Sequence, residues 1–172
     1  RIESRGLGDV YKRQGVINGA LSSKTKRIEK SGRTFCYKVT EQIAITQADV
    51  RAIQLAKAAL YAGFRLLMDK MGVEKVDKVI LAGAFGTHIE PRYAMILGMV
   101  PDCELKNVIG VGNSAGAGAR MALLSLMART EIEKIVRQID KIETAIEPAF
   151  QDHFVRAMAF PHKTDPYSLL SL

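Results

Sequence analysis

The sequence predicts an α/β fold in which a mixed or parallel sheet is flanked by helices. Two short β-rich runs, residues 78–82 and 107–111, are each followed by glycine and then by a helical pattern. Gly83 and Gly112 therefore repeat one unit of strand, glycine turn and helix 29 residues apart. This order is typical of parallel strands joined by helical connections.

The composition is that of a globular chain. Of the 172 residues, 48% are hydrophobic and 25% are charged, which excludes a disordered tail and a collagen-like fibre. No apolar stretch reaches 18 residues, so we expect no membrane partner and no secretory signal. The two cysteines, Cys36 and Cys103, form no C-x-x-C motif, which excludes a disulfide framework and an iron–sulfur or zinc module and favours a cytoplasmic location.

The positive charge is concentrated near the N-terminus. The net charge is +7, but residues 1–33 hold nine basic and three acidic side chains, which leaves sixteen and fifteen in residues 34–172. A binding surface for nucleic acid needs basic residues spread over one face of the fold. We therefore expect no nucleic-acid partner.

The N-terminal third divides into two segments. Residues 1–14 contain GLGDVYKRQ, which resembles a translated sequencing adapter, so we expect this segment to be non-native; a natural terminus is the alternative. Residues 15–45 predict a β-hairpin or strands, with a basic turn across residues 22–32.

Residues 46–162 predict the α/β subdomain, followed by a tail over residues 163–172. The capping signal Thr46-x-x-Asp49 begins a helix over residues 47–71, which Gly72 ends. Ile53, Ala56, Leu60, Phe64, Leu67 and Met68 form its apolar face, and Gln54, Lys57, Tyr61, Arg65 and Asp69 lie opposite. Further helices are predicted over residues 91–98, 114–128 and 150–160, and another runs from the capping box Thr130-x-x-Glu133 to about Ile146.

The two glycine turns are the candidate site. Ligands of open α/β sheets bind where parallel strands end, and glycine allows close approach of the backbone to a nucleotide or phosphate. Glycine needed only to form the turn is the alternative. The match of residues 110–115 to G-x-G-x-x-A is attributed to chance, because Glu131 and Glu133 fall within a predicted helix. His88, His153 and His162 are scattered, so we predict no metal ligands, and no catalytic residue is singled out.

Three segments together carry a family resemblance. They are KVILAGAFGTHIEPRYAMILGMVPDCEL, VGNSAGAGARMALL and ITQADVRAIQLAKAALYAGFRLLM. The chain resembles the C-terminal domain of the reductive activators of corrinoid proteins, from the superfamily of acetate and sugar kinases, Hsp70 and actin. The resemblance runs from about residue 15 to residue 162 and implies the second, ribonuclease-H-like half of an actin-like ATPase.

The resemblance also implies a site and a function. Gly83, Ala84, Phe85 and Gly86 match the adenosine motif, with Ala84 where a second glycine usually stands, and Gly112 and Asn113 would border the cleft. The implied cofactor is ATP with Mg, bound weakly or not at all by this piece. The implied activity is ATP-dependent return of a Co(II) corrinoid to Co(I) on a methyl-transfer protein, which would be the partner.

The resemblance places the electron-carrying iron–sulfur cluster in an N-terminal domain and the phosphate loop in a first ATPase half. Neither pattern occurs in these residues, so we expect a C-terminal piece of an activator. Another ATPase of the superfamily, such as a dehydratase activator or a small-molecule kinase, is one alternative. A non-catalytic binding module or homodimer built on the helix from Ile132 to Ile146 is the other alternative.

Overall fold

The structure is a computed structural model that describes residues 27–169. It divides into two compact units, Arg1–Leu55 and Ala56–Leu172, with the division inside a helix. The segment 1–14 and the strand expected over residues 15–21 lie outside the described residues.

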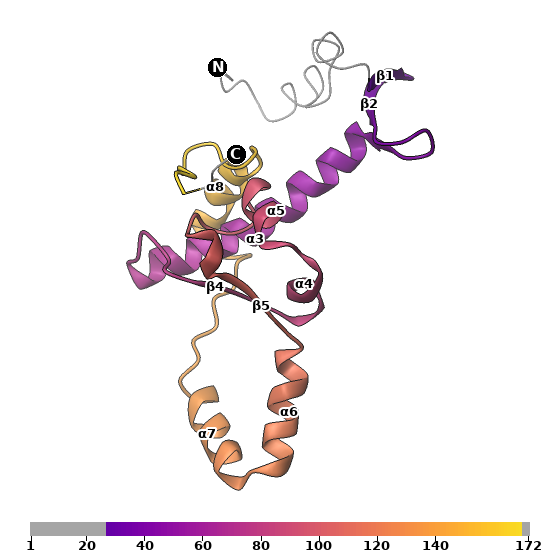
Figure 1. The fold of residues 1–172 in the computed structure, drawn as a ribbon. Coiled ribbons are helices and arrows are strands. Elements are labelled where there is room, and N and C mark those ends of the chain that lie inside the picture. The colour runs from indigo at the N-terminus through magenta and orange to yellow at the C-terminus, as the bar shows by residue number, and fades with distance from the viewer. Residues whose placement is uncertain (1–26, 170–172) are drawn as a thin grey trace. The chain divides into compact units, whose positions relative to one another are not determined.

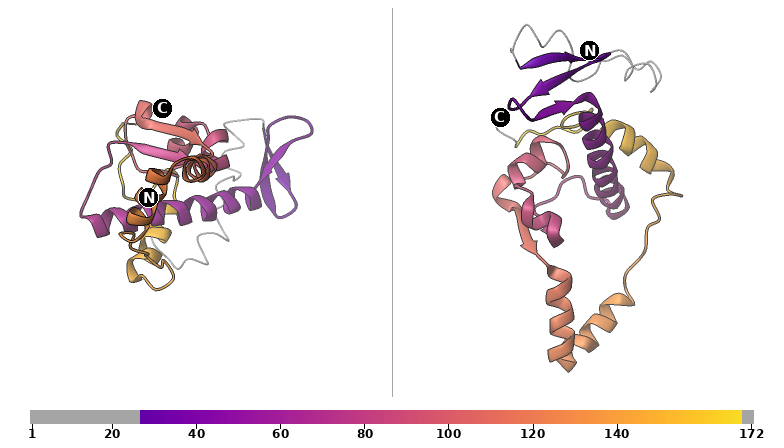
Figure 2. Two further views of the ribbon diagram at one scale, coloured as in Figure 1. Left: turned by 90° about the horizontal axis from the view of Figure 1, so that it is seen from below. Right: turned by 90° about the vertical axis from the view of Figure 1, so that its right-hand side faces the viewer.

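The first unit contains a three-stranded antiparallel sheet (Figure 2). The strands β1 (Ile28–Ser31), β2 (Thr34–Lys38) and β3 (Ala44–Thr46) lie in that order, and Ile28 pairs with Tyr37. The expected turn over residues 22–32 is wrong in position, because residues 28–31 form a strand. The chain turns at Gly32, whose φ of 59° suits glycine and strains other residues.

Helix α3 (Gln47–Met71) has the predicted length and the predicted caps. The Thr46 backbone N–H donates to Asp49 Oδ2 at 2.8 Å, and the Asp49 N–H donates to Thr46 Oγ1 at 3.2 Å. These reciprocal bonds satisfy two donors that a helix start leaves without partners. At the other end Gly72 has a φ of 65°, as expected of a glycine that ends a helix.

The predicted inward face of α3 is wrong for its central turns. Lys57 and Tyr61, placed on the polar face, are only 1% and 2% exposed, whereas Leu60 is 37% and Leu67 is 50% exposed. The reason is that polar partners more than 100 residues further along the chain cover Lys57 and Tyr61. Phe64 is partly buried against the apolar core, as the pattern predicted.

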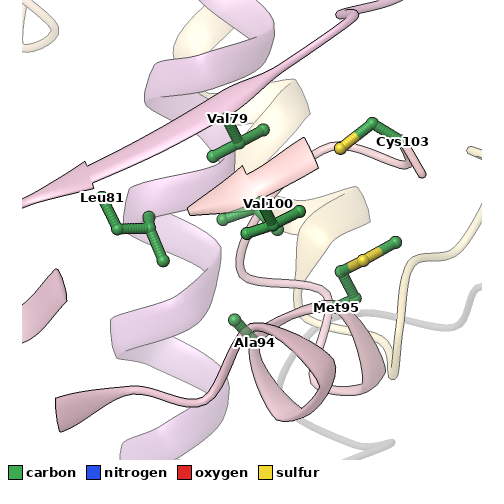
Figure 3. Close-up of a cluster of buried hydrophobic side chains, with 7 residues drawn as sticks. Val79, Leu81, Ala94, Met95, Val100 and Cys103 are labelled. Atoms are coloured by element: carbon green, nitrogen blue, oxygen red, sulfur yellow. The ribbon is translucent and has the colours of Figure 1, made fainter. Parts of the chain in front are cut away.

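The core of the second unit is built on two parallel strands. Strands β4 (Val79–Ala82) and β5 (Val108–Gly112) pair from Val79 and Val108 onward, as predicted for this α/β unit. Side chains of β4 and of helix α5 (Pro91–Ile96) meet in a buried cluster (Figure 3), whose members are Val79, Leu81, Ala94, Met95, Val100, Cys103 and Val108. A short 3-10 helix, η1 (Leu105–Asn107), precedes β5, and Asn107 Nδ2 donates to the Asp77 carbonyl oxygen at 2.9 Å.

The helices after β5 differ from the prediction. The expected helix 114–128 is two helices, α6 (Ser114–Leu124) and α7 (Leu126–Val136), which meet at Ser125 (Figure 1). Ser125 has extended backbone angles, and its hydroxyl accepts from the Ala128 N–H, so it caps α7. The expected start at Thr130 is therefore wrong, and α7 stops ten residues before Ile146. Helix α8 (Pro148–Ala157) follows.

Candidate functional site

The candidate site begins where β4 ends. Gly83 has a φ of 85°, and a Cβ added there would meet no heavy atom within 4 Å. The glycine therefore serves the backbone conformation and leaves open space beside the chain. Instead of an open turn, the chain enters helix α4 (Gly83–His88) at once, and Thr87 Oγ1 donates to the Gly83 carbonyl oxygen at 3.1 Å.

The end of β5 has the same backbone feature. Gly112 has a φ of 65°, and an added Cβ would find only Thr87 Oγ1, at 3.8 Å. Asn113 follows as the cap of α6, and its Oδ1 accepts from the Gly116 N–H at 2.9 Å. Asn113 is exposed, so its side chain stays accessible to a ligand.

The strand pairing brings these two ends together. Ala82 pairs with Gly112 across the sheet, so the residues that follow each strand lie at the same edge. Thr87 also lies there and was not predicted from the sequence. Its position one helical turn after Gly83 is the signal that would have found it.

Gly86 has a different role in the packing of this edge. A Cβ on Gly86 would collide with the Leu81 carbonyl oxygen, and a Cβ on Gly110 would collide with the Gly86 carbonyl oxygen. The two glycines let the backbone of α4 lie directly on β4 and β5. Of the other predicted residues, Ala84 is exposed, and the side chain of Phe85 lies outside what the structure describes.

Three findings concern metal, membrane and cysteine chemistry. Over residues 27–169 no group of three or more His, Cys, Asp and Glu side chains is arranged to hold a metal ion. The helices in that range include none long and apolar enough to cross a membrane. Cys36 and Cys103 are both buried free thiols.

Comparison with known proteins decides the family. Residues 6–170 match the family model described as the C-terminal domain of RACo, the ASKHA domain. The chain belongs to this family. Its actin-like fold is thus the one predicted.

Two relatives of this ASKHA domain carry informative names. The chain is 39% identical over 122 residues to "Corrinoid activation enzyme RamQ" of Eubacterium limosum, which covers 70% of this chain and 21% of that protein. It is also similar to a solved structure named "Reductive activator for corrinoid,iron-sulfur protein", with a TM-score of 0.70 and 32% identity. That match covers 91% of this chain and 28% of the solved chain. The chain therefore spans between about a fifth and three tenths of the length of these relatives.

Apart from the glycine edge, the ASKHA domain contains a polar cluster that joins α3 to residues 159–169. We name these residues the C-terminal strap. Lys57 Nζ donates to the carbonyl oxygens of Ala159 and of Pro161, the latter at 2.5 Å, and lies 5.0 Å from the centre of the Phe160 ring. Burial lowers the pKa of Lys57 to about 8. Because both carbonyl groups face a buried amine, Lys57 fixes the start of the strap.

The middle of the strap is held by Tyr61. The Tyr61 hydroxyl donates to Asp165 Oδ2 at 2.7 Å, and its ring centre lies 4.7 Å from that of His162. Burial, with Tyr167 and Asp165 nearby, raises the pKa of Tyr61 far above its ordinary value. Burial alone would raise the pKa of Asp165, but the Tyr61 hydroxyl, His162 and Arg65 hold it below the usual range.

The end of the strap is tied to residues 98–104, which we name the connector and which lead from α5 to η1. The Tyr167 hydroxyl donates to the Val100 carbonyl oxygen at 2.7 Å. Asp102 Oδ2 accepts from the Ser168 hydroxyl at 3.3 Å and from the Leu169 N–H at 3.2 Å. The segment expected as a tail thus makes defined polar contacts up to Leu169. Nothing in the residue pattern of 163–169 predicts these contacts.

Proposed function

We propose that this chain forms the nucleotide-cleft half of an ATP-dependent reductive activator, which returns the Co(II) corrinoid of a methyl-transfer protein to Co(I). Membership of the ASKHA family and the printed names of the two relatives support this proposal. The observation that carries it in the fold is the shared edge formed by Gly83 and by Gly112 with Asn113.

The residues of this edge fit a nucleotide. Gly83 and Gly112 adopt positive φ angles, and a Cβ added to either would meet no backbone atom within 4 Å beyond its chain neighbours and the turns of its own helix, so a flat adenosine group has room beside the main chain. Ala84 adds little bulk, and the exposed Asn113 amide supplies a donor and an acceptor. In this proposal these residues hold the adenosine side of ATP, whose hydrolysis supplies the free energy for the reduction.

In this proposal the role of the chain is therefore to bind ATP and to orient it. The start of α6 directs backbone N–H groups and the positive end of the helix dipole toward the end of β5, which favours a negatively charged ligand. Magnesium would arrive with the phosphates. The electron would come from an iron–sulfur domain elsewhere in the whole activator, and the corrinoid cobalt is the substrate.

A domain replacement in a full-length relative tests the proposal. This chain would replace the C-terminal domain of the corrinoid activation enzyme, and ATP-dependent loss of the Co(II) absorption would be followed on its corrinoid protein. We expect activity in the hybrid, and a loss of about tenfold or more with Gly112→Val, which places a branched side chain at the edge. Lys75→Ala, an exposed substitution in the loop after α3, is the matched control and should retain activity.

Two results would overturn the proposal. One is full activity of a correctly folded Gly112→Val hybrid, since the edge would then be irrelevant to the nucleotide. The other is an upstream reading frame that contains neither a C-x4-C-x2-C-type ferredoxin pattern nor a D-x-G-T strand. Circular dichroism melting of each hybrid separates lost folding from lost binding.

We propose in addition that the chain self-associates through α6 and α7. Neither helix contains a buried residue, and their apolar side chains are largely exposed, among them Leu124 and Met127 at 77% and 84%. An apolar surface of this kind commonly marks an interface. Sedimentation velocity across a range of concentrations should show a dimer, and a monomer throughout would refute this proposal.

A further inference from the structure

We propose that His162 is an acid-sensitive latch, whose protonation releases the C-terminal strap from α3 and from the connector. The proposal rests on how the imidazole is bonded, on what surrounds it, and on what the strap holds in place.

The imidazole of His162 acts as an acceptor for the backbone of its own strap. Its Nδ1 accepts from the Asp165 N–H at 2.8 Å and from the Thr164 N–H at 3.3 Å. A nitrogen that accepts two N–H groups carries no proton, so the ring is neutral with its hydrogen on Nε2. A proton added to Nδ1 would convert this acceptor into a donor and would break both bonds.

The surroundings of the ring disfavour a positive charge, although Asp165 Oδ1 lies 3.5 Å from Nδ1. The side chain is 2% exposed, and Nε2 is buried without a hydrogen-bond partner among the described residues. Charged neighbours come from every element packed around it: Lys57 and Arg65 on α3, Arg156 on α8, and Asp165 on the strap. The phenol rings of Tyr61 and Tyr167 stay neutral.

The balance of these charges opposes protonation. Burial is the main effect, and three cations add to it, whereas Asp165 alone favours the charged ring. Together they lower the pKa of His162 to about 4. In a released strap the ring would recover its ordinary pKa near 6.5. Mild acid therefore shifts the equilibrium between the closed and the released state toward release.

Release of the strap would free the connector. Tyr167 binds the Val100 carbonyl group, Ser168 and Leu169 bind Asp102, and the Pro161 carbonyl group lies against Gly98 so closely that a Cβ there would collide with it. The connector contains the buried Cys103 and continues through η1 into β5. The latch thus acts on the segment that positions β5, and Cys103 can report on its opening.

The experiment measures reaction of Cys103 with dithiodipyridine, a disulfide reagent that modifies thiols even at acid pH. The chain carries Cys36→Ser, which leaves Cys103 as the single thiol. For a ring whose pKa rises from about 4 to about 6.5 on release, opening should become about 25-fold more favourable between pH 7 and pH 5. The rate of Cys103 modification is divided by the rate for the urea-unfolded chain at the same pH. This normalised rate should rise by the same factor between pH 7 and pH 5.

Two substitutions separate the latch from a general effect of acid. His162→Gln retains an oxygen that accepts from the strap and does not titrate, so the normalised rate should stay flat. His153→Gln is the matched control, since His153 pairs with Asp69 outside the strap, and should keep the 25-fold rise. The proposal would be overturned if the normalised rate depended on pH equally in the His162→Gln variant and in the chain that keeps all three histidines.

A direct titration keeps the proposal testable if His162→Gln fails to fold. The imidazole resonances of the three histidines would be followed by NMR, with His88→Gln and His153→Gln used for assignment. We expect a His162 midpoint well below 6.5, accompanied by shifts of the Thr164 and Asp165 amide resonances. A midpoint at or above 6.5, or titration without those shifts, would overturn it.

Discussion

Replacement of Gly86 by alanine should destabilise the second unit, although alanine is normally the better residue in a helix. A Cβ at this position would collide with the carbonyl oxygen of Leu81 and would lie 3.0 Å from Leu81 Cβ. Both atoms belong to β4, so no side-chain rotation relieves the contact. Helix α4 would have to move by roughly 1.5 Å away from the strand to restore an ordinary contact distance.

The expected magnitude follows from two opposing effects. Overpacking in a rigid core costs about 1–3 kcal/mol, and a backbone obstacle places Gly86→Ala near the upper value. The gain in helix propensity of about 0.5–1 kcal/mol offsets part of this cost. The net loss in free energy of unfolding is therefore about 2 kcal/mol, which corresponds to a fall in Tm of roughly 4–8 °C for a chain of this size.

The assay is urea denaturation followed by circular dichroism, with Gly118→Ala as the matched control. Gly118 also lies in a helix, but an added Cβ would meet no atom within 4 Å, so this variant should be unchanged or more stable by up to about 1 kcal/mol. Equal effects of the two substitutions would refute the packing argument. That result would leave the nucleotide edge as the explanation for a glycine at position 86.

Three further predictions concern single residues. Lys57→Met removes the donor to the two strap carbonyl groups, and the end of the lysine's desolvation penalty offsets part of that loss. We expect the free energy of unfolding, measured by urea denaturation, to fall by about 1–3 kcal/mol. Unchanged stability would contradict this prediction. The low pKa of His162 means that the unfolded chain takes up a proton below pH 6.5 while the folded chain does not until about pH 4, so stability should fall with acid by up to about 1.4 kcal/mol per pH unit in that window. Urea midpoints at several pH values test this, and His162→Gln should remove the slope. Gly112→Ala places a Cβ on a residue with a φ of 65°, which should cost about 1–2 kcal/mol by thermal denaturation; no change would show that the strand end relaxes.

The sequence determined the elements whose signals are local. The reciprocal cap of Thr46 and Asp49 and the terminal Gly72 set the bounds of α3, because capping depends on residues a few positions apart. The glycines that follow the two β-rich runs also predicted the candidate site, because only glycine adopts a positive φ at little cost. Three matched segments in order were enough to indicate the family.

The tertiary structure decided which faces are buried. Helical periodicity separated Leu60 from Lys57 and Tyr61, but it assigned the apolar side to the interior, and Lys57 and Tyr61 are the buried ones. Their burial depends on the carbonyl groups of Ala159 and Pro161 and on Asp165, which lie more than 100 positions away. A pattern of hydrophobicity contains no information on such distant hydrogen bonds. The sequence predicted two parallel strands with a glycine at each end, but the register that pairs Ala82 with Gly112 was visible only in the tertiary structure.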